Sequence, residues 1–107
     1  MKLSHNYYVY ILECSDKSYY TGITNDLEKR VSEHNLGLDH RSYTYVRRPV
    51  TLKYFEHFTD ATQAIGREKQ IKGWSRKKKE ALMNENYLLL QEYSKNTLRQ
   101  AQGDNRV

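Results

Sequence analysis

The chain has little of three features that mark large classes of protein: cysteine, long apolar runs and an apolar N-terminus. Its one cysteine, Cys14, cannot form an internal disulfide, which favours a reducing compartment. One cysteine and four scattered histidines also make no structural zinc pattern. No run approaches the roughly 18 apolar residues of a membrane-spanning helix. Residues 1–6 lack the apolar core of a secretory signal, so we expect a cytoplasmic protein without a membrane partner.

Apolar residues are also scarce, at 37% of the 107 positions against roughly 45–50% in an average globular domain. A chain of this length has room for one domain with a small core. Lys and Arg outnumber Asp and Glu by 18 to 13, an excess that suits an acidic partner such as nucleic acid without proving one. Tyrosine is the residue in excess, with ten against two phenylalanines and one tryptophan.

Three segments have the composition of strands, rich in β-branched and aromatic residues. Residues 7–14 are followed, after a short turn, by residues 19–24, so we expect these two segments to form a hairpin. Residues 50–58 alternate well enough for a third strand. Gly22 lies inside the second strand, where a glycine indicates a bulge or the close approach of another chain or ligand.

Three helices are predicted from capping residues and apolar spacing. Asn25 is expected to cap the first, which ends near Gly37. Asp60 is expected to cap the second, which runs to about Gly73, and Ser75 to cap the third. The expected apolar face of the second helix comprises Ala61, Ala64, Ile65 and Ile71.

The order strand–strand–helix–strand–helix–helix predicts an α+β fold with helices packed on a small sheet. We expect residues 1–93 to form this single domain. Residues 94–107 are polar and are expected to be a flexible C-terminal tail.

Glu68 lies on the expected apolar face of the second helix, at a position where the spacing predicts an apolar side chain. Burying an unpaired charge is costly, so this carboxylate needs a cation, a metal or a hydrogen-bond network. Two interpretations are open. Glu68 is a metal-binding or acid–base carboxylate, or it is an edge residue of a narrow apolar stripe that pairs with Lys72 four residues on. The pattern alone favours the second.

Arg30 and His34 are four residues apart and therefore share a face of the first helix. A guanidinium can hold two phosphate oxygens and an imidazole can move a proton near neutral pH, so the pair suits a phosphate site. The alternative is a solvated helix face, which the pair taken alone favours.

Tyr10 and Tyr20 are expected to lie side by side on one face of the hairpin, beside Gly22. Two phenols next to a backbone cleared by glycine could bind or activate a water at a phosphate. An ordinary tyrosine titrates near 10, so a catalytic phenol needs a nearby cation or proton acceptor. Plain strand packing is sufficient for most of the other tyrosines.

Positive charge is concentrated at residues 41–53 and 67–79. In the second segment seven of thirteen residues are Lys or Arg, and Glu68 is the single acid. This pattern favours contact with a nucleic-acid backbone over a merely solvated helix face. The candidate nucleic-acid-binding residues are Arg41, Arg47, Arg48, Arg67, Lys69, Lys72, Arg76, Lys77 and Lys78.

Taken together, these motifs resemble the GIY-YIG nuclease domain. Residues 8–10 (Tyr-Val-Tyr) and 20–22 (Tyr-Thr-Gly) are similar to the paired motif that gives this family its name, and the spacing to Arg30 and His34 also fits. The likeness covers about residues 6–83 and is greatest to the small stand-alone bacterial members. Other segments that fit this subgroup are residues 47–50, 67–68 and 71–72.

The resemblance implies a three-stranded antiparallel sheet flanked by helices, and cleavage of DNA phosphodiester bonds with a divalent metal, Mg²⁺ or Mn²⁺. Tyr20 would activate the attacking water, with Tyr10 beside it, and His34 would assist proton transfer. Arg30 would stabilise charge on the scissile phosphate, and Glu68 would hold the metal.

The chain also departs from the family pattern. Tyr8, Val9 and Thr21 are mild changes within the paired motif, and Gly22 would still let the strand approach the phosphate. Some members carry a lysine directly after this glycine, where the chain has Ile23. A cation that would help to lower a tyrosine pKa is therefore missing from that position.

Three functions are compatible with these observations, and the third, a basic structural or RNA-associated protein, leaves the position of Glu68 on an apolar face unexplained. The first is a metal-dependent endonuclease that acts on DNA, structure-specifically or not, in repair or processing, with RNA as an alternative substrate. The second is a nucleic-acid-binding module of nuclease descent that cuts weakly or not at all, which Ile23 and the short chain favour. The joint presence of two tyrosines, Arg30, His34 and Glu68 favours the first, because binding alone would not require this set.

Overall fold

The computed structural model describes residues 5–94, which form three strands and four α-helices in the order ββα-β-ααα. The predicted α+β fold is confirmed, with one additional helix at 87–94. Ser94 is the last described residue of that helix, and the rest of the expected tail lies outside the described residues. No helix within 5–94 is long and apolar enough to cross a membrane.

The chain divides into two compact units, one up to Gly73 and one from Trp74 onward. The first contains all three strands and the first two helices, and the second contains α3 (Arg76–Met83) and the helix at 87–94. That residues 1–93 act as a single domain stays a prediction.

The sheet has the strand order β2-β1-β3, and both pairings are antiparallel. The strands are β1 (Tyr7–Glu13), β2 (Tyr19–Thr24) and β3 (Thr51–Phe58), close to the predicted segments. β1 is the central strand, and this explains its continuous apolar sequence, because a central strand covered on both faces has no solvent side.

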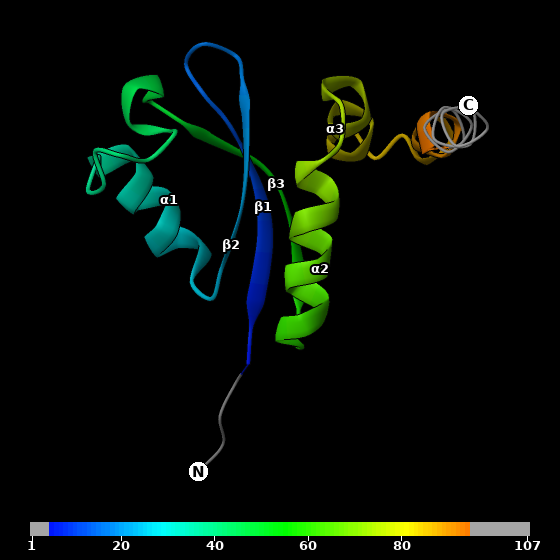
Figure 1. The fold of residues 1–107 in the computed structure, drawn as a ribbon, viewed down its shortest axis with the longest axis horizontal. Coiled ribbons are helices and arrows are strands. Elements are labelled where there is room, and N and C mark those ends of the chain that lie inside the picture. Colours follow the sequence, from blue (N-terminus) through cyan, green and yellow to red (C-terminus); the bar gives the residue numbers. More distant parts are fainter. Residues whose placement is uncertain (1–4, 95–107) are drawn as a thin grey trace, which may run out of the picture. The chain divides into compact units, whose positions relative to one another are not determined.

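The two helices of the first unit lie on opposite sides of this sheet (Figure 1). Tyr8, Tyr10 and Leu12 point to the side of α1 (Leu27–Leu36), where Leu12 packs in a cluster that includes Val31 of this helix. Val9 and Ile11 point to the side of α2 (Ala61–Lys72) and are fully buried. The small core is therefore split into two layers, one on each side of β1.

Side-chain caps fix where the helices begin. Asp60 and Ser75 cap α2 and α3 as predicted, since their oxygens accept hydrogen bonds from backbone N–H groups three residues on. The cap of α1 is Asp26 and not Asn25: its Oδ1 accepts from Lys29 N at 3.2 Å. α1 ends at Gly37, whose left-handed backbone (φ 69°) suits glycine.

The apolar face of α2 is narrower than predicted. Its buried residues are Ala64, Glu68 and Ile71, which follow one another at spacings of four and three. Ile65 is 44% exposed, so its assignment to the core was wrong. It lies one residue, or about 100° of helix, beyond the buried stripe.

Gly22 creates the space in which the Tyr10 ring lies. The two residues are directly opposed across β1 and β2. A Cβ atom on Gly22 would lie 2.7 Å from Cε2 of Tyr10 and closer still to its hydroxyl oxygen. The glycine inside this strand is therefore required by the packing of a buried phenol, while an approach of its backbone to a phosphate stays a prediction.

We expect Gly22→Ala to destabilise the protein by about 1–3 kcal/mol, because the new methyl group overpacks the Tyr10 ring. Gly66→Ala is the matched control. This glycine is exposed on α2, and a methyl group added to it would meet no atom within 4 Å outside the backbone of its own helix. Alanine there is expected to stabilise the helix by up to about 1 kcal/mol. Urea denaturation of both variants gives the two free energies of unfolding. Equal shifts in the two variants would contradict the packing role of Gly22.

Candidate active site

His34, in the last turn of α1, connects the sheet to the loop that follows this helix. Its Nε2 lies 2.9 Å from the Tyr10 hydroxyl, and its Nδ1 lies 2.8 Å from Oγ1 of Thr44. Tyr10 and Thr44 are each only 1% exposed. Both ring nitrogens of His34 therefore have a buried hydroxyl partner, so the imidazole is held in one orientation.

Tyr20 completes an aromatic cluster around this histidine. Its ring centroid is 6.3 Å from that of Tyr10 and 5.2 Å from that of His34. The structure thus places the two tyrosines side by side, as the period-two pattern predicts. On its other side Tyr20 stacks on Tyr43 at 6.1 Å, and the guanidinium of Arg47 lies 3.8 Å from the Tyr43 ring centroid.

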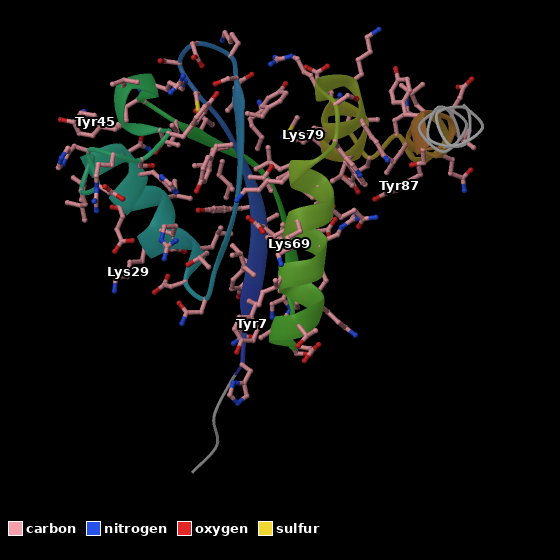
Figure 2. All side chains as sticks on the ribbon, viewed as in Figure 1. Tyr7, Lys29, Tyr45, Lys69, Lys79 and Tyr87 are labelled. Carbon is pink, nitrogen blue, oxygen red and sulfur yellow. The ribbon has the colours of Figure 1, made fainter. Side chains whose placement is uncertain are left out.

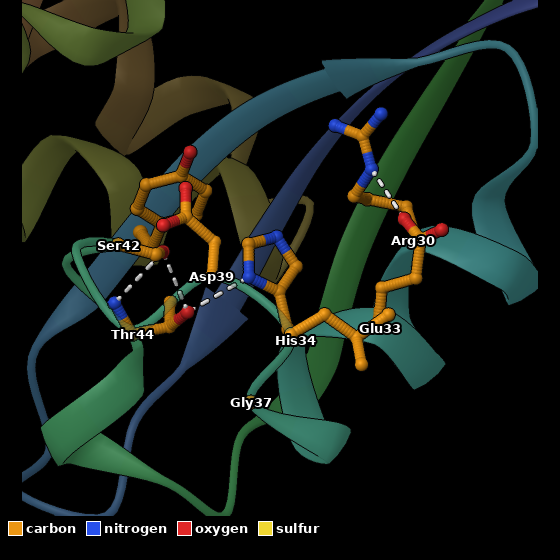
Figure 3. Close-up of a pocket in the computed structure, with 9 residues that line it drawn as sticks. Arg30, Glu33, His34, Gly37, Asp39, Ser42 and Thr44 are labelled. Atoms are coloured by element: carbon orange, nitrogen blue, oxygen red, sulfur yellow. Dashed lines mark hydrogen bonds and ion pairs between the residues drawn. The ribbon is translucent and has the colours of Figure 1, made fainter.

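A cleft of about 370 Å³ opens beside His34, between α1 and the loop that follows it (Figure 3). Arg30 extends from α1 into this site, and its Nε lies 3.2 Å from Oε1 of Glu33. The Arg30 side chain is 44% exposed, so a substrate anion can reach it. The residues that line the cleft are Tyr20, Arg30, Glu33, His34, Gly37, Leu38, Asp39, Ser42 and Thr44.

Burial and neighbouring charges set the protonation states of this cluster. Burial, reinforced by the neighbouring Tyr20, raises the pKa of Tyr10 to about 12, while Arg30 acts in the opposite direction. Burial and then the charge of Arg30 lower the pKa of His34 below its ordinary value, against a smaller opposing effect of Glu33. Near neutral pH the site therefore holds a protonated phenol against a neutral imidazole.

The structure confirms the predicted ion pair between Glu68 and Lys72, and a metal-binding or acid–base role of this carboxylate stays a prediction. Glu68 is only 8% exposed, on the buried face of α2, and its Oε2 lies 2.6 Å from Nζ of Lys72. It does not line the cleft beside His34, but its charge makes a small contribution to the raised pKa of Tyr10.

Lys72 supplies a cation that the sequence pattern does not place near Tyr20. The hydrogen bond to Glu68 is the main cause that raises the pKa of Lys72, and the charge of Tyr20 adds to it. The side chains of Lys72 and Tyr20 are therefore close enough to interact electrostatically. The sequence carries no signal for this, because the two residues lie on different elements about fifty positions apart.

The carboxylate of Glu68 suits an ion that prefers oxygen ligands, such as Mg²⁺ or Mn²⁺. Within the described residues, no three His, Cys, Asp or Glu side chains gather into a metal-binding group. Lys72 contacts one oxygen of Glu68 and leaves the other outside that ion pair. Mg²⁺ usually binds proteins through one or two carboxylates and keeps several of its waters, so one carboxylate is a sufficient protein ligand.

Several of the candidate nucleic-acid-binding residues already have partners within the first unit. Arg47 lies 3.1 Å from Asp16, and Arg67 makes two hydrogen bonds of 2.9 Å to Glu56. Arg48 covers the ring of Tyr45 at 4.3 Å and donates to its carbonyl oxygen. These cations hold loops and strands in place, which charge counting alone does not reveal.

The remaining candidates differ in exposure. In the second unit, Lys78 is buried over the ring of Trp74, and Arg76 lies 3.2 Å from Glu80. Lys77 in that unit and Arg41 and Lys69 in the first are exposed, and Lys69 is labelled on α2 in Figure 2. Arg41 makes a loose, exposed contact of 3.6 Å with Asp39.

The sequence did not point to Thr44 as a functional residue. Thr44 lies in a polar loop without periodicity, and its partner His34 is ten positions away. Glu33 and Asp39 also line the cleft, and a half-buried acid on a helix and an exposed acid on a loop carry no signal of their own. Only the folded loop brings these side chains to the histidine.

Comparison with known proteins shows the family of the chain. The model of the GIY-YIG catalytic domain matches residues 6–84. A UPF0213 protein of Haloquadratum walsbyi is 51% identical over 79 residues, which cover 74% of this chain and 88% of that protein. A UPF0213 protein of Bacillus pumilus is 47% identical over 81 residues, covering 76% and 82%.

Two solution NMR structures have the same fold. A UPF0213 protein of Bacillus halodurans is 42% identical with a TM-score of 0.50, covering 74% of this chain and 83% of that one. A protein of E. faecalis is 38% identical with a TM-score of 0.54, covering 81% and 90%. The chain belongs to the GIY-YIG catalytic-domain family, among the small UPF0213 proteins of bacteria and archaea.

Proposed function

We propose that this protein is a divalent-metal-dependent endonuclease that hydrolyses phosphodiester bonds in DNA, in repair or processing in the cytoplasm. The observation that carries the proposal is that His34, Tyr20 and Arg30 line one open cleft, while the buried phenol of Tyr10 lies against the imidazole of His34. Family membership supports nuclease-type chemistry, and the substrate, the metal and the roles of individual residues are our inference.

Tyr20 is proposed to orient and activate the attacking water. Its side chain lines the cleft, and within the described residues its hydroxyl has no protein hydrogen-bond partner. His34 is proposed to take up the proton that the water loses, with Tyr10 as a relay: the phenol gives its own proton to Nε2 of His34 as it receives another in its place. Tyr10 cannot be the final acceptor, because burial keeps its phenol protonated, whereas the neutral His34 has room for one more proton.

Arg30 is proposed to bind the scissile phosphate. Its guanidinium would exchange the contact with Glu33 for two phosphate oxygens, and would stabilise the charge that develops as water attacks phosphorus. Glu68 would hold Mg²⁺ or Mn²⁺, which supplies Lewis-acid charge at a phosphate oxygen when it is bound. Lys72 would balance the charge of Glu68 and support Tyr20.

The exposed cations are proposed to contact the nucleic-acid backbone. Three exposed members of the predicted set have the weakest interactions within the protein: Arg41, Lys69 and Lys77. They would therefore contribute most to binding. DNA is the proposed partner, and RNA is the alternative that the same phosphate chemistry would accept.

We expect Glu68→Gln and Arg30→Ala each to lower Mg²⁺-dependent cleavage by about 10²–10³-fold, as loss of a charge-stabilising group typically does. Glu28→Gln and Lys29→Ala are matched controls, since both residues are exposed on α1 and have no role in the proposed chemistry. The measurement is cleavage of a panel of branched, flapped, single-stranded and duplex DNA and of RNA, with Mg²⁺ and with Mn²⁺.

Full metal-dependent activity in both site variants would contradict these assignments. Salt-sensitive binding without any product under either metal would instead favour a binding module of nuclease descent. Circular dichroism of each variant establishes that the fold is retained.

The rate of cleavage is expected to fall on acidification as His34 becomes protonated. Because burial and Arg30 lower the pKa of His34 below its ordinary value of 6.5, half of the imidazole is protonated only at a pH below 6.5. The acidic limb of the kcat/KM profile should therefore have its midpoint below 6.5, and an NMR titration of His34 should give the same midpoint. A limb centred above 6.5 would show that another group controls the rate.

A further inference from the structure

We propose that Thr44 is a positioning residue of the nuclease site proposed above: its hydroxyl accepts the Nδ1 proton of His34 and thereby keeps Nε2 available to accept a proton from Tyr10. The contacts that carry this inference are the distances of 2.8 Å and 2.9 Å on the two sides of the imidazole. The hydroxyl of Thr44 contacts His34 and Ser42, and it would act on Tyr10 through His34.

The position of Thr44 is set by its own loop and does not depend on His34. Ser42 N donates to the carbonyl oxygen of Asp39, and Tyr45 N donates to that of Ser42, at 3.0 and 3.1 Å. Arg47 N in turn donates to the carbonyl oxygen of Thr44 at 3.0 Å. The loop thus presents the hydroxyl of Thr44 as a preset partner for the histidine (Figure 3).

The direction of the hydrogen bonds follows from counting protons. A neutral imidazole carries one N–H proton, so one of its nitrogens donates and the other accepts. Tyr10 keeps its proton because its pKa is raised to about 12, and Arg30, the other group that stabilises this oxygen, has only donors to offer. The phenol proton is therefore directed at Nε2 of His34, and the imidazole proton must lie on Nδ1.

The proton on Nδ1 then requires an acceptor, and Oγ1 of Thr44 is in place for it. The hydroxyl of Thr44 can in turn donate a hydrogen bond to Oγ of Ser42, 3.0 Å away. The result is one directed chain of hydrogen bonds from Tyr10 through His34 and Thr44 to Ser42.

Reversing the tautomer would disable this chain. With the proton on Nε2, the imidazole would donate to Tyr10, and the phenol would have no proton acceptor at the histidine. Titration of His34 also depends on the groups that face it: Arg30 and Glu33 on its own helix, Tyr10 and Tyr20 from the sheet, and Thr44 from the loop. Of these, Thr44 is the one that contacts Nδ1.

The test compares Thr44→Val with Thr44→Ser in the full chain. Valine keeps the shape of threonine but removes the acceptor, whereas serine keeps it. Long-range ¹H–¹⁵N NMR spectra report the tautomer of His34, whose signal is identified by its loss in His34→Gln. We expect the Nδ1–H tautomer in the wild type and in Thr44→Ser, and a shift toward Nε2–H in Thr44→Val. Cleavage should fall about 10–100-fold in Thr44→Val and be restored in Thr44→Ser, as for other residues that orient a functional histidine.

An Nε2–H tautomer in the wild type would overturn the inference without any variant, so it stays testable even if Thr44→Val does not fold. An unchanged tautomer in a folded Thr44→Val would also overturn it. If the tautomer changes as expected but neither the wild type nor Thr44→Ser cleaves any substrate, the role of Thr44 in holding His34 is supported and the nuclease function is what fails.

Discussion

The hydrogen bond between Tyr10 and His34 is the contact on which the rest of the site depends. It joins the central strand to α1, and it exists only because Gly22 on the neighbouring strand leaves room for a buried phenol. Burial then separates the proton affinities of the two groups, since it raises the pKa of the tyrosine and lowers that of the histidine. A donor and an acceptor are thereby fixed face to face before any substrate binds, which is the pre-organisation that acid–base chemistry requires.

The sequence was sufficient for the architecture and for the residues with a regular spacing. The three strands, the caps Asp60 and Ser75 and the pairing of Tyr10 with Tyr20 follow from period and local chemistry, which are short-range properties. The unusual carboxylate Glu68 was visible because it interrupts an apolar stripe. The cap of α1 was misplaced by one residue, because Asn25 and Asp26 are both suitable caps and only the fold selects one of them.

The sequence could not predict contacts between residues on different elements, because no regular spacing connects such residues. Lys72 comes within electrostatic range of Tyr20 from another element, and Thr44 is brought to His34 by a loop whose course depends on its backbone hydrogen bonds. Ile65 was assigned to the core because an amphipathic pattern does not define the width of the buried stripe, which depends on how closely the helix approaches the sheet.

The internal partners of the arginines have a consequence for how strongly this protein would respond to ionic strength. Arg67 is bound to Glu56 through two hydrogen bonds, and Arg47 lies between Asp16 and the ring of Tyr43. Binding to duplex DNA releases condensed counterions in proportion to the phosphates that a protein neutralises, with a slope of about −0.9 per phosphate in log affinity against log salt. Arginines committed to acids and aromatic rings release none, so the effective charge toward a polyanion is smaller than the basic composition indicates.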